Sequence, residues 1–87
     1  MLIPDDTFSI FAAMKKDITK AFGIKVAELR KKQGLSQEEL AYRCGVHRTY
    51  IGFIERGEKS PTLKTVEKIL NGLNISLSEL WEAMQTD

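Results

Sequence analysis

Apolar residues recur every three or four positions along most of this chain, which is the spacing that places them on one face of a helix. The pattern is clearest within residues 36–57, where two short apolar stripes stand on either side of Gly45. The spacing predicts two short helices that bury their apolar faces in one core. The stripes consist of Leu40, Ala41 and Cys44, followed by Val46, Tyr50, Ile51 and Ile54.

Polar residues and glycines mark where these two helices begin and end. Ser36 is followed three residues later by Glu39, the spacing of a capping box, in which each side chain bonds a free backbone N–H of the other residue. Gly45 and Gly57 follow the two stripes, and glycine adopts the left-handed conformation that ends a helix without steric cost. The segment is therefore predicted to be a helix, a tight turn and a second helix.

Residues 17–33 are predicted to form a helix before this pair, ended by Gly34. Its last turn holds Arg30, Lys31 and Lys32, for which contact with the phosphate backbone of a ligand and complementation of the helix dipole are the two interpretations. We favour the dipole for at least two of the three. The predicted buried stripe is Ile18, Phe22, Val26 and Leu29.

Two more helices are predicted after the pair. Thr62 is a candidate N-cap for the first, and Asn74 stands just past its end, where asparagine tolerates the left-handed conformation. Ser76 and Glu79 have the spacing of a second capping box, which starts the other helix. The two predicted apolar faces are Leu63, Val66, Leu70 and Leu73, then Leu77, Leu80, Trp81 and Met84.

No strand pattern occurs, so the predicted fold class is all-α, a compact domain of five helices. Residues 18–87 form the predicted domain, and residues 1–17 form an N-terminal extension. Phe8, Phe11 and Met14 recur at threes in that extension, which is either an extra helix or a frayed arm.

Several motifs resemble those of one known family. Ala41, Gly45, Ile51 and Ile54 resemble the small–turn–apolar–apolar skeleton of the helix-turn-helix in phage repressors and their bacterial relatives. The runs GLSQEEL, IERG and SLSEL are similar to this repressor-like family of Cro/CI or XRE type, over about residues 22–81. The segment RTYI..IERG further resembles the small controller proteins of restriction–modification systems. The resemblance implies a sequence-specific regulator that binds double-stranded operator DNA.

Length and composition narrow the chemistry. The chain has 87 residues, the length of one small domain, and a single cysteine, so neither an intramolecular disulfide nor a cluster of metal ligands is expected. We predict no metal and no cofactor. The acidic start is unlike a signal peptide and no apolar run is long enough to cross a membrane, so a cytoplasmic protein is expected.

The charge is concentrated by position. Residues 15–68 hold all 13 lysines and arginines and seven of the 12 acids, a balance of +6, although the whole chain carries only +1. A basic centre between acidic ends suits a molecule whose middle faces phosphate, and a solvated surface explains the asymmetry about equally well.

The second helix of such a motif lies in the DNA major groove with its N-terminal residues against base edges. Arg48 is the strongest candidate, because its planar fork can donate two hydrogen bonds to one guanine. Phe53 is predicted either to pack on thymine methyls or to fold back onto the body. His47 is interpreted as a surface cap of the helix. The predicted base-contacting residues are Arg48, Thr49, His47, Gly52 and Phe53.

Contacts with the phosphate backbone are predicted around this helix. Gln37 lies at the N-terminus of the preceding helix, where backbone N–H groups attract an anion, and the resemblance implies the same contact. Arg56 has an alternative partner in a nearby carboxylate, and the resemblance gives Glu55 a structural role. The predicted phosphate-contacting residues are Gln37, Tyr50, Arg56, Lys59, Ser60 and Arg43.

One recognition helix reads few base pairs, so a homodimer on an inverted repeat is expected. The C-terminal segment holds more apolar residues than a short helix needs for docking. The predicted dimer face is Leu73, Ile75, Leu77, Trp81 and Met84.

Two other functions compete with a regulator. One is an antitoxin that represses its own operon, for which residues 1–17 are the only spare toxin-binding sequence. The other is a protein-interaction module of the same fold that does not bind DNA. An enzyme is not expected, because the chain has one histidine, one cysteine and no arrangement of nucleophile, base and orienting group.

Overall fold

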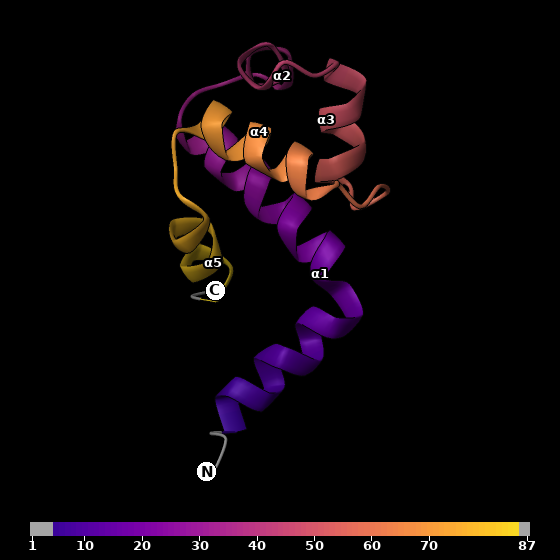
Figure 1. Cartoon of the computed structure of the whole chain (residues 1–87), viewed down its shortest axis with the longest axis vertical. Coiled ribbons are helices and arrows are strands. Elements are labelled where there is room, and N and C mark those ends of the chain that lie inside the picture. Colours follow the sequence, from indigo (N-terminus) through magenta and orange to yellow (C-terminus); the bar gives the residue numbers. More distant parts are fainter. Residues whose placement is uncertain (1–4, 86–87) are drawn as a thin grey trace.

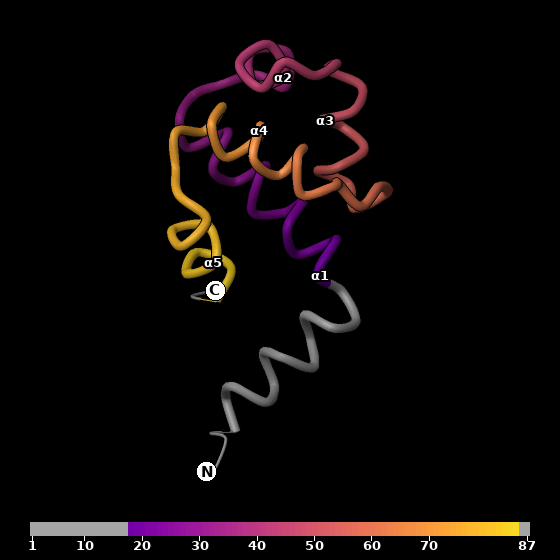
Figure 2. The backbone as a smooth tube through the Cα atoms, viewed as in Figure 1, coloured from indigo at the N-terminus to yellow at the C-terminus, as the bar shows by residue number. Residues whose placement is uncertain are grey.

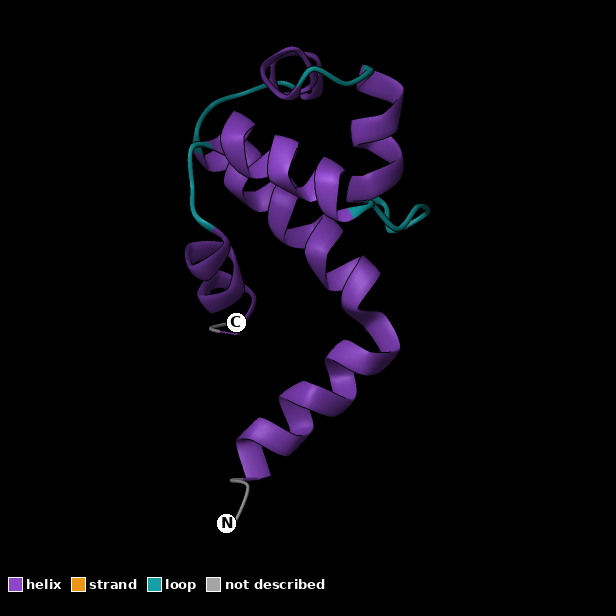
Figure 3. Ribbon diagram, viewed as in Figure 1, coloured by secondary structure: helices purple, strands orange, loops and turns teal. Residues whose placement is uncertain are grey.

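The computed structural model describes the backbone of residues 5–85 and the side chains of residues 18–85. The described residues form five helices, which Figure 1 labels α1 to α5, and none of the residues in this range forms a strand (Figure 3). The apolar positions predicted at Phe8, Phe11 and Met14 lie outside the described side chains. The helices are α1 Asp5–Lys32, α2 Gln37–Cys44, α3 Arg48–Glu55, α4 Leu63–Leu73 and α5 Leu77–Gln85.

The helix, tight turn and helix predicted from residues 36–57 are present as α2 and α3. Ser36 and Glu39 form the complete capping box, with both hydrogen bonds made. Gly45 ends α2 with φ 72°, in the left-handed region, and its N–H bonds carbonyls of the last turn. Gly57 has the same φ just after α3. The local signals in the sequence therefore determine both ends of the motif.

The caps of the last two helices also agree with the sequence. Thr62 accepts a hydrogen bond from the backbone N–H of Thr65 at the start of α4, and Asn74 follows that helix with φ 56°. Ser76 and Glu79 form the second capping box ahead of α5. In both boxes the backbone N–H of the serine bonds the glutamate, which lowers the pKa of Glu39 and of Glu79.

The helices pack in a chain of neighbours. Helix α1 contacts α3 and α5, and α2 contacts α3 and α4. Figure 2 shows how the backbone leaves α2 at the top of the molecule, turns into α3 and returns across the body through α4. This arrangement places the outer side of α3 at one surface, and its inner side in the core.

The core holds most of the predicted apolar stripes, with two corrections. Leu63 is 89% exposed and Ile18 is 43% exposed, so neither belongs to the buried stripe predicted for it. Ile69, which the predicted stripe of α4 omitted, is fully buried because it lies one turn before Leu73. The buried apolar residues are Phe22, Val26, Leu35, Leu40, Ala41, Cys44, Ile51, Ile54, Ile69, Leu73 and Leu80.

Two helical glycines lie at close contacts between helices. A Cβ built on Gly23 falls 2.0 Å from the carbonyl oxygen of Ile54, and one on Gly72 falls 2.5 Å from Sγ of Cys44. The sequence shows these glycines only as weak points of their helices. The structure shows that they allow α1 to approach α3 and α4 to approach α2.

No helix within the described part of the chain is both long and apolar enough to cross a membrane.

Candidate nucleic-acid interface

The first turn of α3 presents polar side chains to solvent. His47 is the N-cap, as predicted, and its Nδ1 accepts a hydrogen bond from the backbone N–H of Thr49 at 3.0 Å. Arg48 and Thr49 follow as the first two residues of the helix, and both are exposed. The cap therefore holds these two side chains on a helix end that points outward.

The two remaining predicted base-contacting residues, Gly52 and Phe53, are both at least partly buried. Gly52 is buried, because the side chain of Arg56 covers it: a Cβ built there falls 3.1 Å from Nη1 of Arg56. Gly52 therefore lies on the side of α3 that faces away from the core, but Arg56 shields it from solvent. Phe53 is half-buried, and its ring faces two cations, Arg56 and Lys59.

A shallow surface depression adjoins the start of α3. Its lining includes Arg48 and His47 together with Glu38 and Tyr42 from α2. Tyr42 is 89% exposed, and the sequence analysis did not single it out. Its position one residue after Ala41, off the buried face of α2, was the signal available in the sequence. The depression makes α2 a neighbour of any ligand that contacts Arg48.

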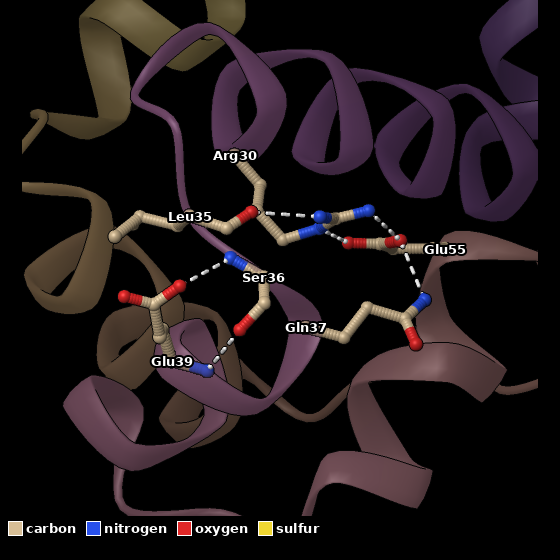
Figure 4. Close-up of polar contacts among 6 residues, drawn as sticks. All are labelled: Arg30, Leu35, Ser36, Gln37, Glu39 and Glu55. Atoms are coloured by element: carbon tan, nitrogen blue, oxygen red, sulfur yellow. Dashed lines mark hydrogen bonds and ion pairs between the residues drawn. The ribbon is translucent and has the colours of Figure 1, made fainter.

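A buried ion pair attaches α3 to α1. The guanidinium of Arg30 donates to both carboxylate oxygens of Glu55, from Nε at 2.6 Å and from Nη2 at 3.1 Å. Its Nη1 also donates to the carbonyl oxygen of Leu35 at 2.8 Å (Figure 4). The two charged side chains are only 11% and 7% exposed. Arg30 is therefore not accessible to a DNA backbone, and Glu55 has the structural role that the resemblance implies.

The same carboxylate connects α3 with the start of α2. Nε2 of Gln37 donates to Oε1 of Glu55 at 2.9 Å, as Figure 4 shows. Gln37 is half-buried at the first residue of α2, beside the free N–H groups of that helix end. Glu55 thus orients a residue predicted to contact phosphate, and it fixes the position of the recognition helix at the same time.

Most of the other predicted phosphate-contacting side chains are accessible. Arg56 pairs with Glu58, and Nε lies 2.6 Å from Oε2. Tyr50 is half-buried and packs against the core through its ring. The exposed members of the predicted set are Arg43, Arg56, Lys59 and Ser60.

The predicted dimer face is divided between core and surface. Leu73 is 1% exposed, so it belongs to the core of the subunit and is removed from the predicted face. Ile75 and Met84 are partly buried against that core. Leu77 and Trp81 are 61% and 42% exposed, and they line a largely apolar groove of about 210 Å³ between α1 and α5, which Val66 of α4 and the loop residues Ser60 and Pro61 also line.

Cys44 is buried, as predicted, and this burial raises the pKa of its thiol. Among the described residues, no three histidine, cysteine or acidic side chains are grouped so that they could hold a metal ion.

Two short helices joined by a tight turn at Gly45, with the first turn of the second helix exposed, define the helix-turn-helix class. Residues 26–80 match the family model described as helix-turn-helix. The chain is 43% identical over 68 residues to control protein C.BamHI of Bacillus amyloliquefaciens, covering 77% of this chain and 84% of that protein. It is also 43% identical over 72 residues to control protein C.MunI of a Mycoplasma species, covering 82% and 97%.

Solved structures agree with this similarity. The restriction–modification controller protein C.AhdI from Aeromonas hydrophila matches with a TM-score of 0.70 and 40% identity, over 72% of this chain and 96% of that one. The C.Esp1396I tetramer in complex with its natural 35 base-pair operator matches with a TM-score of 0.74 and 33% identity, over 77% and 88%. The chain therefore belongs to the helix-turn-helix family and is similar to restriction–modification controller proteins, which confirms the resemblance seen in the sequence.

Proposed function

We propose that this protein is a sequence-specific regulator of transcription that binds double-stranded operator DNA as a homodimer, in the manner of a restriction–modification controller. The observation that supports it most directly is the first turn of α3. Arg48 and Thr49 are exposed there, while the buried pair of Arg30 and Glu55 holds the helix in place. A rigid helix with polar side chains at its N-terminus matches the geometry that reads base edges in the major groove.

In this proposal Arg48 and Thr49 read bases, and His47 contributes as the cap that orients them. Arg48 supplies a bidentate contact to guanine, and the methyl of Thr49 suits a thymine methyl. Solved structures of C.Esp1396I include variants at three consecutive residues, an arginine, a threonine and a tyrosine. The same three residue types stand together here at positions 48–50.

The proposed phosphate contacts surround that helix. Gln37 contacts phosphate at the positive end of α2, and its hydrogen bond to Glu55 is either kept or given up when the phosphate binds. In this proposal the ring of Phe53 lies between the base-reading and the phosphate-contacting side chains, at the edge of the major groove. The remaining proposed contacts are Arg43, Tyr50, Arg56, Lys59 and Ser60.

We further propose that the domain of residues 18–87 dimerises through the exposed part of α5. Leu77 and Trp81 supply the exposed apolar surface, and Ile75 and Met84 extend it. The assembly of C.Esp1396I as a tetramer on its operator supports self-association in this family. Residues 1–17 are an extension to this domain. The protein is proposed to act in the cytoplasm, by binding and without catalysis.

Selection of bound duplexes from a random pool tests this function. The expected product is one inverted-repeat sequence whose two half-sites lie about 34–36 Å apart along the duplex. Binding to that sequence should weaken steeply with salt, because each phosphate contact releases counterions. Retention of all duplexes alike would overturn the proposed sequence specificity. Retention of none would overturn DNA binding and favour a protein-interaction module.

A further inference from the structure

One aromatic ring and three charged side chains lie together at the C-terminal end of α3. We call them the Phe53 cluster: Phe53, Arg56, Glu58 and Lys59. The guanidinium of Arg56 lies 5.4 Å from the centre of the Phe53 ring, and Nζ of Lys59 lies 5.3 Å from the same centre. Each contact has the geometry of a cation–π interaction. The ring therefore holds two positive charges close to the proposed DNA-facing side of α3.

The position of Arg56 depends on two further features. It folds back over Gly52, where the absence of a side chain leaves room for its guanidinium. Its Nε pairs with a carboxylate oxygen of Glu58 at 2.6 Å. The side chains of Arg56 and Glu58 are 55% and 51% exposed, so solvent reaches this ion pair.

We propose that Glu58 competes with DNA phosphate for Arg56, and so sets the strength of DNA binding without affecting the choice of sequence. The inference rests on the proposed function. A carboxylate and a phosphate are both oxyanions that a guanidinium binds through the same N–H groups. In the free protein Nε of Arg56 donates to a carboxylate oxygen of Glu58, so a phosphate that binds this edge of the guanidinium displaces the carboxylate.

The energies are consistent with such an exchange. An exposed ion pair contributes little stability, so a bound phosphate can break this pair at small cost. The displaced carboxylate stays two residues from Arg56 and repels the same phosphate. Because neither effect depends on the base pairs, Glu58 weakens binding to every duplex by a similar factor.

The variant Glu58→Gln tests the competition in the full-length protein. We expect its affinity to rise roughly two- to fivefold for each subunit of the dimer, the factor that corresponds to one exposed ion pair. The gain should be equal on the selected operator and on a random duplex. The slope of log affinity against log salt should steepen by about one for each subunit of the dimer, because each Arg56 then meets a phosphate without a competing carboxylate. The urea midpoint should stay unchanged.

Two comparisons separate this effect from a change in net charge. Glu67→Gln removes an exposed carboxylate from α4 and should give a clearly smaller gain. In an Arg56→Gln background, Glu58→Gln should give only the gain of that control, because the cation for which it competes is absent.

Equal gains from Glu58→Gln and Glu67→Gln, or a full gain in the Arg56→Gln background, would overturn the inference. Unchanged affinity and salt dependence for Glu58→Gln would do the same, while the wild-type protein still selects its operator. If the wild-type protein binds no duplex, the proposed function itself fails. The two failures are therefore distinguishable.

Discussion

Single side chains at the start of α3 separate sequence choice from general affinity. Arg48 and Thr49 are exposed in the first turn, where base edges are within reach in the proposed complex. Lys59 lies beyond the other end of the helix, next to the ring of Phe53. Substitutions at the two ends of α3 should therefore have different consequences for DNA binding.

Arg48→Ala should weaken binding to the selected operator by about 1–3 kcal/mol and relax the preference for it, because a bidentate contact to guanine is lost. Lys59→Ala should weaken binding to all duplexes alike. Fluorescence anisotropy with the operator and a scrambled duplex measures both. Equal losses on the two duplexes for Arg48→Ala contradict its role as a base reader.

Substitutions at two glycines, Gly23 and Gly52, test how closely single residues are packed. Gly23→Ala gains about 1 kcal/mol of helix propensity, but its Cβ meets the backbone oxygen of Ile54 at 2.0 Å. Since overpacking costs about 1–3 kcal/mol and backbone cannot move aside cheaply, the net result should be a lower free energy of unfolding. Gly52→Ala is the matched control. Its Cβ meets only the flexible end of Arg56, so stability should stay level or rise by about 1 kcal/mol.

Urea denaturation of the two glycine variants at equal protein concentration gives these free energies. A stabilised Gly23→Ala protein would show that α1 and α3 do not approach as closely as the structure indicates.

At the scale of elements, helix ends and helix contacts obey different rules. The N-terminal ends of α2, α5 and α4 are each capped by residues within four positions: Ser36 with Glu39, Ser76 with Glu79, and Thr62 with Thr65. These caps were predictable because they depend on residues close in the chain. The position of α3 against α1 depends instead on Arg30 and Glu55, which stand 25 residues apart.

The two capping boxes predict a loss of stability in acid. The pKa of Glu39 and that of Glu79 are lowered from 4.5 in the folded protein, so their stabilisation is present above that value and disappears as the pH falls through the lower folded pKa. The double variant Glu39→Gln, Glu79→Gln keeps capping groups that do not titrate. Its stability should fall less than that of the wild-type protein between about pH 6 and pH 3.

Urea titrations at several pH values measure this difference. Glu67→Gln is the control, because Glu67 is an exposed carboxylate outside both capping boxes. Identical acid profiles for the double variant and the wild-type protein refute the assignment.

The buried ion pair predicts a marked non-additivity. Glu55→Leu alone leaves the guanidinium of Arg30 buried without its charge partner and should lower the free energy of unfolding by about 3–5 kcal/mol. Adding Arg30→Met replaces the pair by apolar side chains and should recover most of that loss. Urea denaturation of the two single variants and the double variant completes the cycle. Additive losses argue that the pair does not hold α3 on α1.

At the scale of the whole molecule, we propose that two copies of the protein associate through the surface between α1 and α5. Trp81 and Leu77 leave apolar surface exposed along a groove on one subunit, beside the core residue Leu80. A surface of this kind on a small domain is typical of a site where a second protein binds. The opposite end of the molecule, with α2 and α3, stays available for DNA.

Trp81→Ala should therefore lower the mass in sedimentation at micromolar concentration from twice 9.9 kDa toward 9.9 kDa. Tyr42→Ala is the matched control, since Tyr42 is an even more exposed aromatic residue on α2. A wild-type protein that stays monomeric at high concentration, or equal dissociation by both substitutions, rejects α5 as the interface.

The amino-acid sequence by itself determined the order of the helices, their caps and the tight turn at Gly45, because these follow from hydrogen bonds and apolar spacing within one or two turns. It also determined the family. Only the tertiary structure decided which residues meet across the domain. Arg30 pairs with Glu55, Leu63 stays exposed although its spacing predicts a buried position, and Gly23 admits the backbone of α3. Helical spacing cannot specify such contacts, because they depend on how separate helices are placed against one another.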